Sequence, residues 1–276
     1  MPRVLTTLDA WYLNYRTKSH RAGGVRRPMY RLEAERIRRW ERETYRGFSS
    51  VVVVTEQDAA ALRALDRAIP AVVVPNGVDA EHYAPRPGAV ADAGLVVFTG
   101  AMQWAPNVDA ARFLAREVLP LLRRDVTDAR VALVGRTPAA AVCELAELDG
   151  VRVTGAVPDI RDWLLRAEVF ACPMVSGTGI KNKLLEAMAC GLACVVTPLA
   201  CQGLEVRDGD ELLVADGATA MSEQIARLLR DPALRARVGG AARDYVVRHH
   251  SWSAVGRTYE SLLLGATRTS AGARSS

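Results

Sequence analysis

The sequence predicts an α/β protein in which a parallel sheet is covered by helices on both faces. From residue 95 onward, short apolar segments alternate with segments of helical length, as they do in a parallel sheet with crossover helices. The run Val51-Val52-Val53-Val54 is continuous and β-branched, like strands that are buried on both faces. With 276 residues, half of them hydrophobic, the chain can build one large domain or two modest ones.

The regular part of the chain is expected to contain six strands and six helices. The strands are expected at residues 95–99, 130–134, 151–154, 169–172, 193–197 and 211–214. The helices are expected at residues 108–122, 139–148, 160–166, 181–190, 218–229 and 232–247. Residues 95–250 therefore form one predicted domain. A last helix is expected over 251–266, followed by a disordered tail over 267–276.

The chain before residue 95 carries a shorter version of the same pattern. Strands are expected at 3–8, 51–55 and 71–74, and helices at 28–46 and 57–67. The turn residues Pro75-Asn76-Gly77-Val78-Asp79 interrupt the pattern. The following residues are rich in Pro, Gly and Ala, as a linker is. The sequence thus predicts a first domain over 1–80 and a linker over 81–94.

Positive charge is concentrated in residues 16–46. This segment contains eleven Lys or Arg and four Glu, which gives it a charge of +7, whereas the whole chain carries +5. A segment of this kind suits an anionic membrane surface, an acidic substrate or nucleic acid; the alternative is a solvated helix face. Nucleic acid is disfavoured because the only interleaved aromatic residues are Tyr30, Trp40 and Tyr45.

The cysteines and histidines do not have the spacing of a metal site. The five cysteines are odd in number and form no CxxC pair, which indicates reduced thiols rather than disulfides. No apolar run reaches the length of a membrane span. A soluble, cytoplasmic protein without a bound metal is expected.

One stretch after the fourth strand of the regular part has the residues of an anion site. The chain turns at Gly177 and Gly179 and then opens a helix, whose first N–H groups can face an anion. Lys181 and Lys183 lie in the first turn, where the helix dipole favours acidic side chains, so a negatively charged ligand is expected. Glu186 shares a face with Lys183, which suits a nucleoside diphosphate with its phosphates at the lysines and its ribose at the glutamate. The alternative is a crossover helix with solvated lysines, because a glycine-rich turn alone is a weak signal.

A series of short motifs carries a resemblance to a known family. They are Val74-Pro75-Asn76-Gly77-Val78-Asp79, Phe98-Thr99-Gly100, Val134-Gly135-Arg136, Val153-Thr154-Gly155 and Leu185-Glu186-Ala187-Met188-Ala189-Cys190-Gly191. In this order they resemble the group 1 glycosyltransferases of GT-B fold, over nearly the whole chain. The runs Gly100-Ala101-Met102-Gln103-Trp104-Ala105-Pro106-Asn107-Val108-Asp109 and Gly179-Ile180-Lys181-Asn182-Lys183 resemble a bacterial exopolysaccharide-associated subset. The resemblance implies a complete C-terminal Rossmann-like domain and an incomplete N-terminal one.

The resemblance also implies an activity. Such a protein transfers a sugar, with retention of configuration and without a metal or other cofactor, from a nucleoside diphosphate sugar to a saccharide or lipid-linked acceptor. UDP- and GDP-sugars are the expected donors. A non-catalytic nucleotide-sugar-binding subunit, or a degenerate copy that lacks the acceptor domain, is the alternative. An epimerase of the same fold is disfavoured, because no matching set of acidic and histidine residues is found.

The donor-binding residues implied by the resemblance cluster in the regular part. Glu186 matches the acid that holds the ribose, Gly100 matches the glycine of the phosphate-facing loop, and Lys181 and Lys183 replace the usual Arg and Lys on the diphosphate. The full expected set is Gly100, Asn107, Arg136, Val157, Pro158, Gly177, Gly179, Lys181, Lys183, Leu185 and Glu186. Of these, Arg136 and the turn at Val157 and Pro158 fall where the base would bind.

The catalytic residues implied by the resemblance are Asp9, Thr178 and Lys181. Asp9 stands beside Leu8, where the family usually has a histidine. Thr178 stands where many members have a second glutamate, eight residues before the first. This departure leaves the group that recognises the sugar open.

The front of the chain departs further from the family. Several strands and helices of the acceptor-side domain are missing on this comparison, and a partial sheet with unpaired edges is hard to leave exposed. A partner chain that supplies the missing half, a start site placed too far downstream or a degenerate copy would each explain it. The resemblance implies a lipid-linked acceptor at the inner membrane face, so peripheral attachment there through residues 16–46 is expected.

Overall fold

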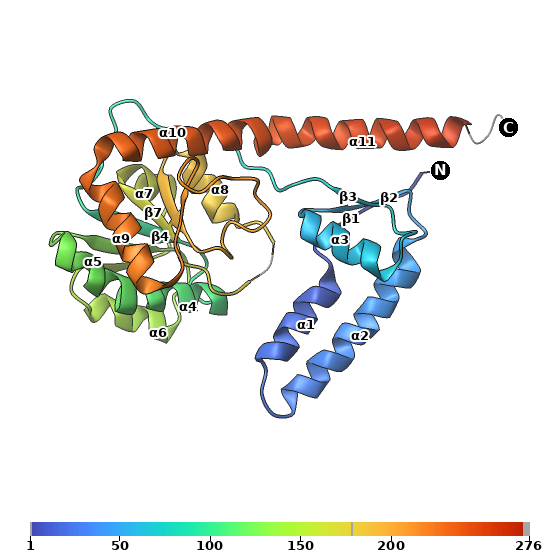
Figure 1. Ribbon diagram of the computed structural model, residues 1–276, viewed down its shortest axis with the longest axis horizontal. Coiled ribbons are helices and arrows are strands. Elements are labelled where there is room, and N and C mark those ends of the chain that lie inside the picture. Colours follow the sequence, from blue (N-terminus) through green and yellow to red (C-terminus); the bar gives the residue numbers. More distant parts are fainter. Residues whose placement is uncertain (1, 178, 273–276) are drawn as a thin grey trace. The chain divides into compact units, whose positions relative to one another are not determined.

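The computed structural model describes residues 2–177 and 179–272, which form two compact units (Figure 1). Unit 1 comprises Met1–Asn76, Thr178–Ile180 and Val255–Ser276, and unit 2 comprises Gly77–Gly177 and Lys181–Ala254. Both units contain a parallel sheet, so the predicted α/β class is confirmed.

Unit 2 is built on a six-stranded parallel sheet. Its strands are β4 (Leu95–Thr99), β5 (Arg130–Val134), β6 (Val151–Gly155), β7 (Val169–Cys172), β8 (Ala193–Val196) and β9 (Leu213–Val214). They lie in the order β6-β5-β4-β7-β8-β9. The central strands β4, β7 and β8 are buried along their full length, as their uninterrupted apolar sequences predict.

Helices cover the sheet of unit 2. They are α4 (Ala105–Phe113), the π-helical segment η1 (Leu114–Val118), α5 (Leu119–Asp125), α6 (Ala140–Cys143), the short 3-10 helix η2 (Glu144–Glu147), α7 (Arg161–Arg166), α8 (Asn182–Ala189), α9 (Gly217–Arg230) and α10 (Pro232–His249). The predicted helices therefore exist, with two of them divided into segments. The division at 108–122 has a local cause: Pro120 cannot donate the backbone bond that an α-helix needs at that position, and the π-helical turn before it absorbs the mismatch.

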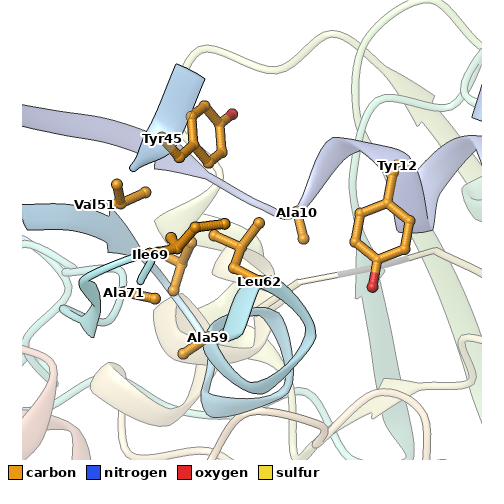
Figure 2. Packing of buried hydrophobic residues seen from close by; sticks show 9 residues of the cluster. Ala10, Tyr12, Tyr45, Val51, Ala59, Leu62, Ile69 and Ala71 are labelled. Atoms are coloured by element: carbon orange, nitrogen blue, oxygen red, sulfur yellow. The ribbon is translucent and has the colours of Figure 1, made fainter. Parts of the chain in front are cut away.

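Unit 1 contains a three-stranded parallel sheet of order β1-β2-β3. Its elements are β1 (Val4–Leu8), α1 (Trp11–Arg21), α2 (Arg26–Tyr45), β2 (Ser50–Val53), α3 (Glu56–Leu65) and β3 (Ala71–Val73). One face of the sheet packs in a core that includes Tyr45, Val51, Leu62 and Ile69 (Figure 2). The helix α1 was not predicted from the sequence.

The start of α1 is capped by carboxylates from other elements. Glu41 of α2 accepts hydrogen bonds from the N–H groups of Trp11, at 2.7 Å, and Tyr12, at 3.4 Å. Asp58 of α3 accepts one from the N–H group of Ala10 at 3.0 Å. Free N–H groups at a helix start need acceptors, and here they come from residues 29 to 48 positions away in the sequence.

The segment predicted as a linker is not a free linker. Arg86 forms an ion pair with Asp162 at 2.8 Å, Asp92 forms one with Arg166 at 2.6 Å, and the carbonyl of His82 accepts a hydrogen bond from Arg161. All these partners belong to unit 2. The division between the units falls at Gly77 rather than at residue 80, and residues 81–94 pack on unit 2.

The last helix, α11 (Trp252–Gly272), continues beyond its predicted end at residue 266. The predicted disordered tail over 267–276 is thus helical as far as Gly272, and its last four residues lie outside the described part of the chain. None of the helices within residues 2–177 and 179–272 combines the length and apolar character needed to span a lipid bilayer.

Candidate functional site

The candidate site lies at the carboxyl edge of the unit 2 sheet, between β4 and β7. The chain leaves β4 toward β5 and β6 on one side of the sheet, and later returns to add β7 on the other side of β4. The loops after β4 and β7 therefore diverge, which makes this edge the topological switch point where α/β sheets bind ligands. The predicted residues Gly100 and Asn107 follow β4, and Gly177, Lys181 and Lys183 follow β7.

Lys183 is the central cation of this edge. Its Nζ atom donates a hydrogen bond to Asn107 Oδ1, lies 3.9 Å from Met174 Sδ and is 4.5 Å from the ring centre of Phe98. All three neighbours are uncharged, and Lys183 makes no ion pair within the described residues. Burial, together with the charge of Lys181, lowers the pKa of Lys183 to about 8.

Glycine at position 100 keeps space open beside Lys183. A Cβ atom on Gly100 would lie 2.6 Å from Asn107 Nδ2 and 2.9 Å from Lys183 Nζ. The φ angle of Gly100 is +156°, which favours glycine. The structure thus brings together three of the predicted donor-binding residues, Gly100, Asn107 and Lys183.

The loops after β4 and β5 are also in close contact. A Cβ atom on Gly135 would lie only 1.7 Å from the carbonyl oxygen of Gly100, so no larger residue fits there. The N–H group of Met102 donates to the carbonyl of Arg136 at 3.0 Å. Arg136 itself is exposed at the end of β5, and Val157 and Pro158 follow β6, one strand farther along the sheet.

The loop after β7 packs on the loop after β4. Gly177 has a φ of +105°, and a Cβ atom on it would lie 3.2 Å from the Trp104 ring. Lys181 is the N-cap residue of α8 and is 6% exposed. The alternative interpretation, in which Lys181 is a solvated lysine on a crossover helix, is therefore excluded, because the side chain is buried.

Glu186 lies one turn farther along α8 and is partly buried. Burial raises the pKa of its carboxyl group, while the charge of Lys183 and a hydrogen bond from Tyr83 act in the opposite direction. Burial and the charge of Glu186 in turn raise the pKa of Tyr83 to about 12. Glu186 and Lys183 are therefore close enough to influence each other, as their spacing in the sequence predicts.

Two buried hydroxyl groups in the same loops have unused hydrogen-bonding capacity. Thr99, the last residue of β4, and Ser176, after β7, are 1% and 2% exposed. Neither Thr99 Oγ1 nor Ser176 Oγ finds a hydrogen-bond partner among the described residues. Buried polar groups are normally paired, so these two add unpaired polar atoms to the loops that flank Lys183.

The remaining predicted residues lie elsewhere. Leu185 is fully buried in the core of unit 2, where its side chain is remote from solvent. Asp9 follows β1 in unit 1, and Gly179 is grouped with the same unit. Thr178 lies outside the described residues. The predicted catalytic roles of Asp9, Thr178 and Lys181 stay predictions.

Sequence reasoning missed Tyr83 and the apolar wall around Lys183. Tyr83 lies in the segment that was predicted as a linker, where a large aromatic side chain next to His82 was the available signal for a packed segment. Phe98 lies in a predicted strand and Met174 closely follows another, and neither was predicted as a site residue. Nothing in their own sequence context distinguishes a residue that faces a half-buried lysine from one that faces other apolar side chains.

The fold and this site define a class: an α/β protein whose sheet edge presents a half-buried cation at its switch point. A family model for group 1 glycosyl transferases matches residues 93–231, which are half of the chain and contain the whole β4–α8 region. The chain therefore belongs to the group 1 glycosyl transferases.

Individual relatives agree with this assignment. A phosphatidyl-myo-inositol mannosyltransferase from Mycolicibacterium smegmatis is 32% identical over 205 residues, which cover 70% of this chain and 52% of the relative. A GDP-mannose-dependent alpha-(1-6)-phosphatidylinositol monomannoside mannosyltransferase from the same organism is 29% identical over 218 residues, or 70% of this chain and 56% of the relative. The chain spans about half the length of these curated relatives.

Solved structures show the same fold. Sucrose-phosphate synthase from Thermosynechococcus elongatus superposes with a TM-score of 0.72 at 20% identity, covering 95% of this chain and 68% of the synthase. Anabaena HepE in complex with UDP gives a TM-score of 0.69 at 15% identity, covering 96% and 72% of the two chains. The parallel, Rossmann-like sheets of this protein are thus those of the GT-B fold.

Proposed function

We propose that this chain binds a nucleoside diphosphate sugar at the carboxyl edge of the unit 2 sheet. We further propose that the protein transfers the sugar to a saccharide or lipid-linked acceptor. The observation that carries the proposal is Lys183: a half-buried ammonium group that makes no ion pair among the described residues, next to Gly100 and at the switch point of the sheet. A diphosphate would supply the negative charge that this position lacks.

Electrostatics supports a diphosphate over a neutral ligand. An enclosed charge is unfavourable unless it is paired, and Lys183 makes no ion pair among the described residues, while the charge of Lys181 further disfavours its protonated form. The first turn of α8 contains no acidic residue, so the positive end of the helix dipole is uncompensated as well. When the bond between the sugar and the diphosphate breaks, negative charge grows on the leaving group, and these fixed positive charges stabilise it.

Glu186 supports the nucleoside part of the proposal. A carboxylate accepts hydrogen bonds, and the two hydroxyl groups of a ribose donate them. The hydroxyl group of Tyr83 acts as a hydrogen-bond donor toward Glu186 and lowers the pKa of its carboxyl group, which favours the charged, accepting form. With Arg136, Val157 and Pro158 at the ends of β5 and β6, the base would extend from Glu186 along the same edge.

The names of the relatives support the substrate class. The mannosyltransferases from Mycolicibacterium smegmatis act on phosphatidylinositol compounds, and one of them depends on GDP-mannose. Structures of Anabaena HepE contain UDP or UDP-glucose. On this basis UDP- and GDP-sugars are the donors to test first, and a lipid-linked saccharide is the acceptor to test first.

The proposed transfer retains the anomeric configuration of the sugar and needs no metal ion. The two lysines supply positive charge at the point where other transferases use a divalent cation, and retention follows from the resemblance to the family. Transfer that continues in excess EDTA, with the anomeric configuration of the donor preserved in the product by proton NMR, would support both. Loss of transfer in EDTA that Mg²⁺ or Mn²⁺ restores would contradict metal independence.

The test of the donor site compares UDP with uridine by calorimetry. The double variant Lys181→Ala/Lys183→Ala is expected to lose affinity for UDP at least tenfold, while its affinity for uridine changes little. The variant Arg112→Ala/Arg116→Ala removes the same charge from exposed positions on α4 and η1 and serves as the control. If both ligands lose affinity equally, or if the control behaves like the lysine variant, the lysines do not bind the diphosphate.

The place of action is proposed to be the cytoplasmic face of the inner membrane. Residues 16–46 form most of the α1–α2 hairpin of unit 1 and carry +7, and each cation near an anionic surface contributes on the order of 1 kcal/mol. Val25, Met29, Leu32 and Trp40 are exposed on this hairpin and can enter the lipid interface. Binding to anionic vesicles that is lost in high salt would support this location, whereas equal recovery with neutral vesicles would contradict it.

A further inference from the structure

A second positively charged site lies in unit 1, in a cavity between α1 and α2. The cavity has a volume of about 540 Å³. Its charged or titratable lining consists of Tyr12, Arg16, His20, Arg27, Arg31, Glu35 and Arg38. Four guanidinium groups from two helices thus surround one space together with a single carboxylate.

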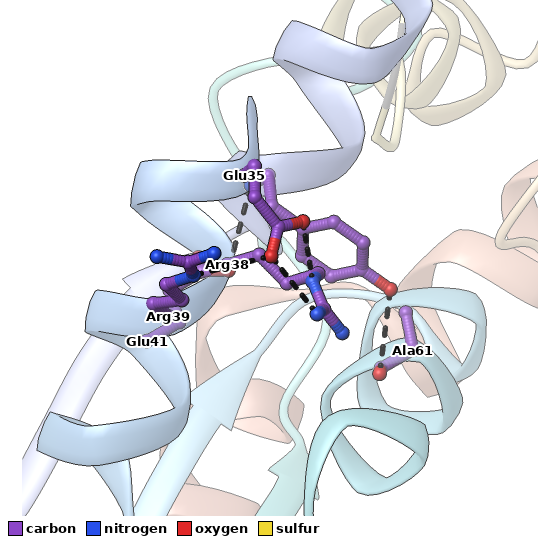
Figure 3. Close-up of polar contacts among 6 residues, drawn as sticks. Glu35, Arg38, Arg39, Glu41 and Ala61 are labelled. Carbon is purple, nitrogen blue, oxygen red and sulfur yellow. Dashed lines mark hydrogen bonds and ion pairs between the residues drawn. The ribbon is translucent and has the colours of Figure 1, made fainter. Parts of the chain in front are cut away.

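The single carboxylate does not neutralise the cavity. Glu35 accepts hydrogen bonds from Arg38 at 2.8 and 3.0 Å and from Arg39 at 3.3 Å (Figure 3). Both oxygen atoms of Glu35 are therefore already used by these two arginines. Arg16, Arg27 and Arg31 form no ion pair with an acidic side chain in the described part of the chain.

The next acid in the sequence, Glu33, forms an ion pair with Arg36 at 3.6 Å and does not line the cavity. Between Arg16 and Leu32 the chain contains six Lys or Arg residues and neither Asp nor Glu. The first turn of α2 lacks both an acidic residue and a side-chain cap, so the positive end of its dipole adds to the field at the Arg27 end of the cavity. Arginines on a merely solvated helix face would instead alternate with acids at helical spacing.

One wall of the cavity is held in place by packing. Tyr12 is buried, and its hydroxyl group donates to the carbonyl of Ala61 in α3 at 3.5 Å. The guanidinium group of Arg16 lies 5.9 Å from the centre of the Tyr12 ring. Ser19, also buried, donates to the carbonyl of Arg16 at 2.7 Å, which stabilises this part of α1.

We propose that the cavity between α1 and α2 binds a phosphate or diphosphate group, held by Arg16, Arg27 and Arg31. The planar, forked guanidinium group matches the oxygen atoms of a phosphate in pairs of hydrogen bonds, and three such groups without acidic partners face one space. The phosphate belongs either to a soluble phosphorylated compound or to a lipid headgroup. The site rests on unit 1 alone and does not depend on the proposed donor site of unit 2.

The experiment measures the binding of inorganic pyrophosphate by calorimetry. All proteins carry Lys181→Ala/Lys183→Ala, so that the proposed donor site does not contribute to the signal. In this background, Arg16→Gln/Arg31→Gln is expected to lose affinity for pyrophosphate at least tenfold. The control Arg26→Gln/Arg36→Gln removes the same charge from exposed positions of α2 outside the cavity and is expected to stay within twofold of its parent.

A second arm identifies the source of the phosphate. Sedimentation with vesicles that contain phosphatidic acid distinguishes a lipid headgroup, for which the cavity variant loses binding, from a soluble compound, for which both variants sediment alike. Absence of pyrophosphate binding in the parent would overturn the proposal. Equal losses of pyrophosphate affinity in the cavity variant and the control would also overturn it. Binding would then depend on the net charge of the protein and not on the residues of the cavity. Circular dichroism spectra and melting temperatures verify that the variants fold.

Discussion

Lys183 combines two properties that rarely occur together in a side chain. It is largely enclosed by Phe98, Asn107 and Met174, yet it belongs to a residue type that water normally solvates. The enclosure disfavours the charged form and lowers the pKa to about 8. A bound anion would favour the charged form again, so proton uptake and ligand binding at this residue are expected to be coupled.

This coupling predicts how donor affinity depends on pH. The pKa of Lys183 in the free protein is about 8, and a bound diphosphate raises it, so binding takes up a proton above that pH. From about pH 7.5 to about pH 9.5 the phosphates of UDP are already fully ionised, because their last pKa is about 6. The affinity of the protein for UDP is therefore expected to fall above pH 8, by up to tenfold per pH unit, in calorimetric titrations.

The matched variant is Lys183→Arg. The guanidinium group stays charged throughout this range, so the pH dependence is expected to flatten even if the affinity itself changes. If the affinity of the wild-type protein for UDP is constant across this pH range, Lys183 does not take up a proton when the phosphates bind.

At Glu186, the prediction concerns binding rather than stability. The change Glu186→Gln removes a charged acceptor whose hydrogen bonds to ribose would each contribute about 1.5–3 kcal/mol, so affinity for UDP should fall by tenfold or more. The melting temperature should change little, because the glutamine keeps the shape of the side chain. Tyr83→Phe removes the hydroxyl group that favours the charged form of Glu186 and should have a smaller effect in the same direction. Unchanged affinity for UDP in Glu186→Gln would remove this residue from the site.

Among the elements, α1 depends most on residues outside itself. Its first N–H groups are bound by Glu41 and Asp58, and Glu41 is fully buried. Burial raises the pKa of Glu41 to about 7, although the hydrogen bonds from Trp11 and Tyr12 act in the opposite direction. The cap of one helix is thus a titratable group in the interior of unit 1.

A pH-dependent stability of unit 1 follows from Glu41. Between its ordinary pKa of 4.5 and its folded value of about 7, the folded chain holds a proton that the unfolded chain has lost. The contribution of Glu41 to the free energy of unfolding therefore decreases as the pH rises through this window, by about 3 kcal/mol at most. Urea unfolding from about pH 5 to about pH 7.5 should show this decrease in the wild type and a flatter profile in Glu41→Gln.

The control for this prediction is Glu43→Gln on the same helix. Glu43 is exposed, so its replacement should leave the pH profile of the wild type intact. If Glu41→Gln and the wild type follow the same profile, Glu41 titrates as it does in water and its burial has no energetic consequence.

The same elements explain what the sequence could predict. Strands such as β4 and β7 are continuous apolar runs that are buried along their whole length, so a local pattern was sufficient to find them. The helix α1 has no acidic residue in its first turn and no side-chain cap of its own. Its cap comes from Glu41 and Asp58, and no pattern local to residues 11–21 reveals it.

The site was predictable in part for a similar reason. Lys183 and Glu186 stand in one helix with an unusual charge order, which the sequence displays directly. The contact between Glu186 and Tyr83 joins residues about a hundred positions apart, in a segment whose composition indicated a linker. The ion pairs that hold this segment, such as Arg86 with Asp162, form only once both partners are brought together by the fold.

For the molecule as a whole, α11 connects the two units. Its first residues, up to Ala254, belong to unit 2, and the residues from Val255 onward belong to unit 1. Within unit 1, Val255 packs with Val52 and Val74, and the partly buried Tyr259 and Leu262 join this second core. The spacing of 255, 259 and 262 places these side chains on one face of the helix. The hydroxyl of Tyr259 also forms a hydrogen bond with Thr6 of β1.

A small three-stranded sheet should depend strongly on this cover, because two- and three-stranded sheets need a packed face to be stable. The variant Val255→Ala/Leu262→Ala is therefore expected to lower the free energy of unfolding of unit 1 by about 2 to 4 kcal/mol. Leu263→Ala/Leu264→Ala changes exposed leucines of the same helix and should alter it by less than about 0.5 kcal/mol. Hydrogen exchange of the β2 amides, followed by mass spectrometry, reports on unit 1 separately from unit 2. Faster exchange in β2 for the first variant alone would establish that α11 stabilises the sheet, whereas equal exchange in both variants would show that unit 1 is stable without it.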